Sequence, residues 1–158
     1  MALKILQSEY KAILKEQNCF YSVKPKMSNF YIWDVLLYGP PETIFEGGIF
    51  ECKIEFTKDY PIKPPRFTFI TNLLHPNIYK NGEVCISILH DGIDEIGYED
   101  TSERWSSSQN VNSILMSIIS ILAEPNFESP ANIDASNEWK NDYNSYKKKV
   151  YSIVANSH

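Results

Sequence analysis

The chain has 158 residues, of which 43% are hydrophobic and 22% are charged. These values are typical of a soluble globular protein and exclude a wholly disordered or collagen-like chain. No stretch approaches the roughly 18 continuous apolar residues that a membrane span needs. The first residues also lack the apolar segment and cleavage site of a secretory signal. We therefore expect a single domain, residues 1–158, in the cytosol or the nucleus.

The net charge of −5 comes from one short segment. Between Asp91 and Arg104 there are six acidic residues and one basic residue, which leaves 14 acids and 14 bases elsewhere. The remainder therefore lacks the basic excess of a nucleic-acid-binding protein, and we expect no nucleic-acid partner. The three cysteines and three histidines do not have metal-ligand spacing, so we also expect no metal site.

The order of periodic segments predicts an α+β fold. Residues 3–15 have helical apolar spacing, and residues 20–70 carry four short apolar or alternating runs, at 20–23, 31–38, 49–56 and 66–70. Segments rich in Pro and Gly separate these runs, as in an antiparallel meander. Helical spacing resumes at Val111 and ends at Pro125, and one further helix is expected from about Ile133 to Ala155. We predict a four-stranded antiparallel sheet with an N-terminal helix, a long loop and C-terminal helices.

The middle segment, residues 71–108, lacks periodicity and is too long for an ordinary connection. It contains Cys85, two of the three histidines and all of the excess negative charge, so we expect the functional site here. Asn81-Gly82 is a strong turn signal. A turn at this point places Asn77 and Cys85, eight residues apart, on neighbouring segments.

The tripeptide His75-Pro76-Asn77 followed by Cys85 resembles the active site of ubiquitin-conjugating enzymes. Other segments that occur in that family's order are Gly39-Pro40-Pro41, Tyr60-Pro61, Arg104-Trp105-Ser106 and Pro125-Asn126. The resemblance implies that the Cys85 thiolate accepts ubiquitin as a thioester and passes it to a lysine of a substrate protein or of another ubiquitin. It also implies no cofactor, because ATP is used by the ubiquitin-activating enzyme upstream.

The residues around the cysteine allow more than one role. By resemblance, the Asn77 amide stabilises the tetrahedral oxyanion, and loss of such a donor elsewhere costs ~10²–10³ in rate; alternatively, it stabilises the turn. We interpret His75 as a packing residue. No histidine partner for Cys85 is evident in the sequence, which argues against a cysteine hydrolase. Cys19 and Cys52 fall in strand or strand-edge patterns and are interpreted as structural.

Cys85 and Trp105 are 20 residues apart, considerably more than in compact members of the family. The additional residues, at about 90–103, resemble the acidic loop of a subgroup that includes the G-type enzymes. That subgroup implies assembly of the polyubiquitin chain that directs proteins to the proteasome. The candidates for orienting or activating the acceptor lysine are His90, Asp94, Glu95, Glu99 and Asp100. The alternative is a solvated loop without a specific role.

The resemblance also implies partner surfaces. Binding of the ubiquitin-activating enzyme and a RING-type ligase is implied for one helix and two loops, at Lys4, Ile62, Lys63 and Ser107. Ile62 is either an exposed anchor or a core residue. Donor ubiquitin would contact the helix face opposite the core, at Asn112, Met116 and Ser120, although the same pattern fits a solvated face. We expect no membrane anchor, so recruitment to the endoplasmic reticulum would need a partner.

Two alternatives to a ubiquitin-conjugating enzyme remain open. The chain could conjugate another ubiquitin-like modifier, which no motif excludes and a charging assay with several modifiers would decide. It could instead be an inactive module that only binds ubiquitin or a ligase. The intact pair of Asn77 and Cys85 argues against an inactive module, because such relatives lack the cysteine.

Overall fold

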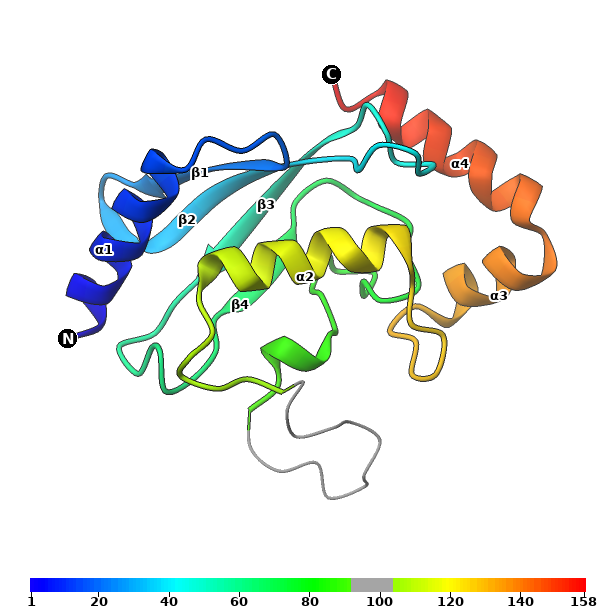
Figure 1. The fold of residues 1–158 in the computed structure, drawn as a ribbon. Coiled ribbons are helices and arrows are strands. Elements are labelled where there is room, and N and C mark those ends of the chain that lie inside the picture. Colours follow the sequence, from blue (N-terminus) through cyan, green and yellow to red (C-terminus); the bar gives the residue numbers. More distant parts are fainter. Residues whose placement is uncertain (92–103) are drawn as a thin grey trace.

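The computed structural model describes residues 1–91 and 104–158. The helices and strands occur in the following order: α1 (Ala2–Lys15), β1 (Tyr21–Lys26), β2 (Asn29–Tyr38), β3 (Ile49–Glu55), β4 (Arg66–Phe69), the short 3-10 helix η1 (Ser87–Leu89), α2 (Val111–Ala123), α3 (Ile133–Asn141) and α4 (Tyr143–Ala155). The strands form one antiparallel sheet in the order β1-β2-β3-β4 (Figure 1). The predicted α+β meander is therefore confirmed.

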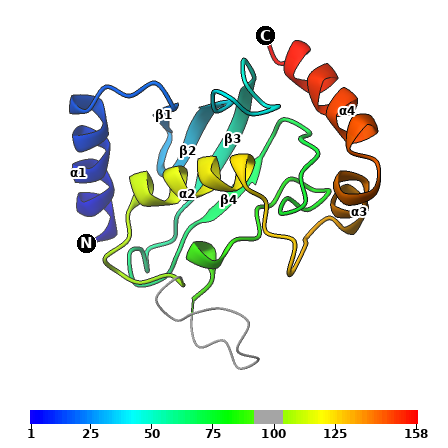
Figure 2. The ribbon, with the colours of Figure 1, turned by 45° about the vertical axis from the view of Figure 1, so that its right-hand side comes forward.

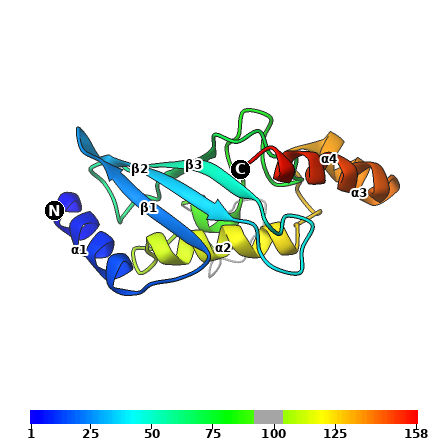
Figure 3. The ribbon, with the colours of Figure 1, turned by 90° about the horizontal axis from the view of Figure 1, so that it is seen from above.

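Helix α2 runs across one face of the sheet, so that the two form separate layers (Figure 3). Helix α1 lies at one end of the sheet, and α3 and α4 lie at the opposite end (Figure 2). None of the helices described is long and apolar enough to cross a membrane. The segment after β4, which contains the predicted site, leads from the edge of the sheet to the start of α2.

The core lies between the sheet and α2, and the alternation of side chains along β2 explains why. Trp33, Val35 and Leu37 are buried, whereas Leu36 between them is 37% exposed. Successive strand residues point to opposite faces, so one face of β2 faces the core. On α2 the core positions follow helical spacing and include Ile114, Leu115, Ile118 and Leu122. Each such side chain contributes about 1.5–3 kcal/mol when fully buried.

Helix α2 begins where the sequence provides a capping box. The Asn110 side chain accepts a hydrogen bond from the Ser113 N–H at 2.8 Å, and the Ser113 hydroxyl accepts one from the Asn110 N–H at 2.9 Å. The Val111 N–H donates instead to Glu9 Oε1 of α1 at 2.7 Å. These bonds satisfy three donors that a helix start leaves without a partner.

The single helix predicted from 133 to 155 is wrong, because the chain breaks at Asp142. This residue has φ −147° and ψ 68°; its N–H donates to the Glu138 carbonyl at the end of α3. Its carboxylate accepts from the Ser145 N–H at 3.2 Å and so caps α4. A short carboxylate bonds well to a helix start and competes with a helix interior. The rings of Trp139 and Tyr146, 4.7 Å apart, continue the apolar spacing across the break.

Candidate active site

A tight hairpin positions the predicted nucleophile. Gly82 has φ 94°, which glycine adopts without strain. A Cβ there would lie 2.1 Å from the Phe69 carbonyl oxygen, because the turn packs against β4. The Phe69 N–H donates to the Gly82 carbonyl at 2.7 Å. Beyond the turn, the Cys85 N–H donates to the Asn77 carbonyl at 2.9 Å. Asn77 and Cys85 therefore lie on neighbouring segments, as predicted.

The Cys85 thiol is half-buried and lines a cleft of about 530 Å³. The walls of the cleft come from the ends of β3 and β4, from the hairpin and from the residues around η1. Cys52 differs from Cys85, because it is buried in β3 and its burial raises the pKa of its thiol. Cys19 is exposed and precedes β1, so it lies outside the strands described. Cys85 alone among the three lines this cleft.

The imidazole of His90 lies beside the Cys85 thiol, with Nε2 3.8 Å from Sγ. The 3-10 helix η1 makes this contact possible, because it turns the chain back within the five residues that separate the two. The His90 N–H donates to the Ser87 carbonyl at 2.9 Å and closes the turn. The interpretation that Cys85 has no histidine partner is therefore wrong. Nothing in the spacing of the two residues indicated the contact.

Tyr79 is a second neighbour of the thiol, and the sequence reasoning did not identify it. Hydrogen bonding to Cys85 and the charge of its sulfur raise the pKa of the Tyr79 hydroxyl, with smaller effects from burial and from Glu83. The Tyr79 N–H donates to the Glu83 carbonyl at 2.8 Å. Tyr79 and Cys85 are therefore diagonal neighbours across the hairpin. The available clue was its place just before the Asn81-Gly82 turn, opposite the segment that carries Cys85.

The Asn77 side chain is buried and binds the backbone of Asn126, in the segment that follows α2. Its Nδ2 donates to the Asn126 carbonyl at 2.8 Å, and its Oδ1 accepts from the Asn126 N–H at 2.9 Å. An amide nitrogen carries two hydrogens, and this arrangement uses one of them. The amide therefore fixes the chain just after α2 against the hairpin that carries Cys85.

The buried ring of His75 holds the chain at the start of the hairpin through two hydrogen bonds. Its ring is fully buried; Nε2 lies 2.7 Å from the Ile121 carbonyl oxygen, and the Asn77 N–H donates to Nδ1 at 3.0 Å. A carbonyl can only accept and an N–H can only donate, so the ring is neutral with its proton on Nε2. Burial lowers the His75 pKa to about 4, although the bond to Ile121 opposes the shift.

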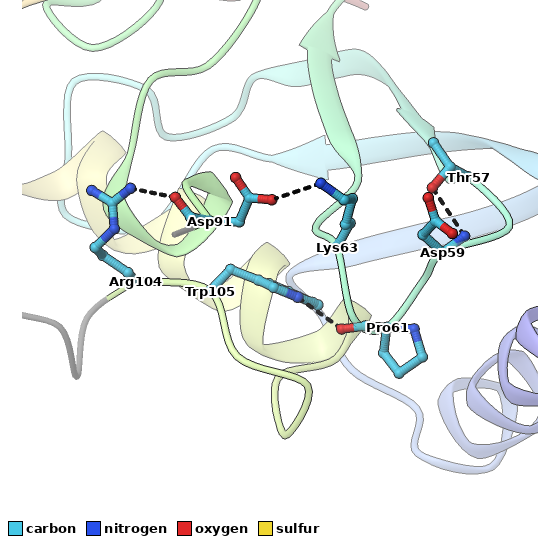
Figure 4. Close-up of polar contacts among 7 residues, drawn as sticks. All are labelled: Thr57, Asp59, Pro61, Lys63, Asp91, Arg104 and Trp105. Carbon is cyan, nitrogen blue, oxygen red and sulfur yellow. Dashed lines mark hydrogen bonds and ion pairs between the residues drawn. The ribbon is translucent and has the colours of Figure 1, made fainter. Parts of the chain in front are cut away.

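The structure describes the two ends of the predicted acidic loop. Asp91 pairs with Lys63 at 3.5 Å, and the Arg104 guanidinium donates to the Asp91 carbonyl (Figure 4). Four of the predicted lysine-orienting residues lie outside the described residues: Asp94, Glu95, Glu99 and Asp100. Within residues 1–91 and 104–158, no three His, Cys, Asp or Glu side chains are grouped to hold a metal ion.

Comparison with known proteins identifies the family. The family model described as ubiquitin-conjugating enzyme matches residues 5–154. The chain is 46% identical to human ubiquitin-conjugating enzyme E2 G2 over 158 residues, which cover 99% of this chain and 96% of the relative. It is 51% identical to probable ubiquitin-conjugating enzyme E2 7 of Caenorhabditis elegans over 131 residues, 82% of this chain and 80% of that protein.

The chain belongs to the ubiquitin-conjugating enzyme family. Ubiquitin-conjugating enzyme E2 15 of Schizosaccharomyces pombe is a further relative, 43% identical over 98% of this chain and 93% of its own. The expected resemblance to the G-type subgroup is confirmed by the relative named G2. Members of this family form a thioester with ubiquitin and work with an activating enzyme and a ligase, so these general partners also follow for this chain.

The predicted ligase- and activating-enzyme surface of this ubiquitin-conjugating enzyme is exposed. Lys4 on α1 and Ser107 before α2 are both exposed. Ile62 is 77% exposed, which excludes the alternative of a core residue. Lys63 is also exposed but pairs with Asp91. The loop containing Ile62 and Lys63 lies close to the site because the Trp105 indole N–H donates to the Pro61 carbonyl at 2.8 Å.

The predicted donor-ubiquitin face lies on the outer side of α2. Asn112, Met116 and Ser120 are exposed, and they follow the i, i+4, i+8 spacing of one helix face. Asn112 has a structural partner, because its Oδ1 accepts a hydrogen bond from the Tyr21 hydroxyl at 2.6 Å. Met116 is therefore the accessible apolar side chain of this face, at 38% exposure.

Proposed function

We propose that Cys85 is the residue on which this enzyme carries ubiquitin, as a thioester to be passed to a lysine. The single observation that carries the proposal is the position of the Cys85 thiol. It is accessible from a cleft, with His90 Nε2 at 3.8 Å and the Tyr79 hydroxyl beside it. Neither of the other two cysteines lines that cleft.

In the first step, the Cys85 thiolate attacks the carbonyl carbon of the thioester that joins ubiquitin to the activating enzyme. The tetrahedral intermediate then expels the activating enzyme's thiolate, so one thioester replaces another. A thiolate is stabilised by nearby hydrogen-bond donors. The Tyr79 hydroxyl and a protonated His90 would both donate to the sulfur. We therefore assign the Tyr79 hydroxyl to stabilising the thiolate before attack. Both groups would stabilise it after departure, when His90 holds the proton taken from the lysine.

In the second step, an acceptor lysine must lose a proton before its amine can attack, because an unperturbed ammonium has a pKa of ~10.4. Imidazoles change protonation near neutral pH, and the distance between His90 and Cys85 supports His90 as the proton acceptor. We further propose that Asp94, Glu95, Glu99 and Asp100 orient the lysine, as carboxylates attract a cation. Negative charge also favours the protonated amine, so orientation is the stronger role.

The Asn77 amide is proposed to act mainly by bracing the hairpin against Asn126. The two hydrogen bonds to that backbone support this role. The second N–H of the same amide is the group that would donate to the tetrahedral oxyanion. Both roles fit one side chain, and the bracing bonds would hold the amide in a fixed orientation for the second.

The partner surfaces are proposed as follows. A RING-type ligase and the activating enzyme would bind the exposed residues of α1 and two loops, namely Lys4, Ile62, Lys63 and Ser107. Donor ubiquitin would bind the α2 face at Asn112, Met116 and Ser120. We propose the proteasome-directing polyubiquitin chain as the product, no cofactor, and a location in the cytosol or nucleus. Recruitment to the endoplasmic reticulum would be through a partner.

A charging assay tests the proposal. The purified chain is incubated with activating enzyme, ATP and ubiquitin and compared with Cys85→Ser and, as the matched control, Cys19→Ser, which changes an exposed cysteine. We expect a reductant-sensitive adduct for the wild type and Cys19→Ser, and a reductant-resistant adduct for Cys85→Ser. Charging of Cys85→Ser through a reductant-sensitive bond would overturn the proposal. Charging with another modifier, but not ubiquitin, would change the substrate and keep the nucleophile.

A further inference from the structure

Trp105 connects the exposed loop at residues 60–63 to His90. Its indole N–H donates to the Pro61 carbonyl at 2.8 Å, and its backbone N–H donates to the His90 carbonyl at 2.9 Å. Figure 4 shows the indole reaching the loop from the chain segment that begins at Arg104. Trp105 is only 7% exposed. Trp105 therefore links the loop, through its side chain, to His90, through its backbone, and the His90 ring lies 3.8 Å from the Cys85 sulfur.

The loop that holds the indole is itself fixed. The Tyr60 ring lies 5.9 Å from the Trp105 ring, and the Tyr60 hydroxyl donates to Glu9 Oε2 at 2.6 Å. Glu9 binds the start of α2 through its other oxygen, so the loop is joined to both α1 and α2. The pair of Lys63 and Asp91 adds a second link between the loop and the His90 segment. Both side chains are at least half exposed, and such pairs contribute about 0–1 kcal/mol. The buried indole bond is the stronger link.

We infer that Trp105 is a positioning residue that holds the His90 ring against Cys85, an inference that rests on the proposed role of His90 in transfer. The indole bond fixes the Trp105 backbone relative to the loop, and the Trp105 N–H fixes the His90 carbonyl. Without the indole bond, the Trp105 backbone would be less firmly held, and so would the His90 carbonyl that it binds. A protein bound at Ile62 would contact the loop one residue from the Pro61 carbonyl, and would therefore affect the hydrogen bond between Pro61 and Trp105.

The test compares Trp105→Phe with a matched control, Trp33→Phe. Trp33 is also buried and also donates its indole N–H to a backbone carbonyl at 2.8 Å, that of Phe30 in the sheet. Both changes keep an aromatic ring and remove one hydrogen bond, worth about 1 kcal/mol. They differ in whether the lost bond supports His90. Thermal unfolding of both variants confirms that each is folded.

The first readout is discharge of the preformed ubiquitin thioester to free lysine in single turnover without ligase. We expect Trp105→Phe to slow discharge about five- to tenfold, as loss of one such bond implies, and Trp33→Phe to leave it within twofold. In a His90→Gln background, Trp105→Phe should have no further effect. An equal slowing with and without His90 would overturn the inference, because Trp105 would then act through the fold alone.

The second readout is the imidazole NMR spectrum of the uncharged protein across pH. Trp105→Phe should shift the His90 resonances and change their titration curve, and Trp33→Phe should not. Unchanged His90 resonances in Trp105→Phe would overturn the inference. This readout needs no thioester, so it decides the inference even if Cys85 fails to charge and the proposed function falls. If His90→Gln discharges ubiquitin at the wild-type rate, the role of His90 in transfer is rejected, charging at Cys85 stands, and the NMR readout still decides the positioning.

Discussion

The buried imidazole of His75 should make the fold sensitive to mild acid. The ring is neutral, because Nδ1 accepts the Asn77 N–H and Nε2 faces the Ile121 carbonyl. A proton on Nδ1 would replace the accepted bond with two facing N–H groups. Burial lowers the His75 pKa to about 4 from an ordinary value of 6.5. The unfolded chain therefore binds a proton at a higher pH than the folded chain does.

The sign and size of the effect follow from these two values. The stability that neutral His75 contributes is fully present above pH 6.5 and is lost as the pH falls towards 4. The complete loss is about 3 kcal/mol, and about 2 kcal/mol of it occurs between pH 7 and pH 5. For a domain with a total stability of about 5–15 kcal/mol, this is a substantial fraction.

Urea unfolding of the wild type and His75→Gln at pH 7 and pH 5 measures the effect. Gln does not titrate in this range, and the carboxylates contribute nearly equally to both proteins. The free energy of unfolding of the wild type, relative to His75→Gln, should fall by about 2 kcal/mol between the two pH values. A constant difference would refute the reasoning. If His75→Gln does not fold, the NMR titration of His75 in the wild type decides, and a midpoint near 6.5 would refute it.

Three further predictions concern the site and its partner surface. Asn77→Ala removes both bonds to the Asn126 backbone and should lower the free energy of unfolding by about 1–3 kcal/mol; an unchanged melting temperature would contradict the bracing role. Tyr79→Phe removes the hydroxyl beside the sulfur and should slow alkylation of Cys85 at neutral pH severalfold, whereas an equal rate would show that the hydroxyl does not stabilise the thiolate. Ile62→Ala should weaken ligase binding about tenfold in calorimetry without changing stability, and Ile133→Ala, also exposed, should bind as the wild type does.

The sequence predicted the parts of the fold in which one face is buried. Strand β2 buries every second residue and helix α2 buries one face, so apolar residues repeat along the sequence with the period of a strand or of a helix. The break at Asp142 was missed for the same reason, because the aromatic residues on both sides keep helical spacing. A single capping residue outweighs that spacing, and periodicity does not detect it.

The site was predictable in its nucleophile but not in its surroundings. Asn81-Gly82 predicted the turn that brings Asn77 next to Cys85, because the signal is local. The contact between His90 and Cys85 depends on how η1 turns the chain, and no spacing encodes this. The place of the loop that carries Ile62 is also set by a long-range contact, because the Pro61 carbonyl accepts a hydrogen bond from the indole of Trp105, which the loop's own sequence does not contain.

The most direct test of the central claim is to identify the cysteine that carries ubiquitin. The charged chain is unfolded in mild acid, its free thiols are blocked with N-ethylmaleimide, the thioester is cleaved by reductant, and the released thiol is labelled with iodoacetamide. The three cysteines fall in different tryptic peptides, residues 16–26, 27–53 and 81–104, so mass spectrometry assigns the label. We predict carbamidomethylation in residues 81–104, at Cys85. The label at Cys19 or Cys52 would contradict the account.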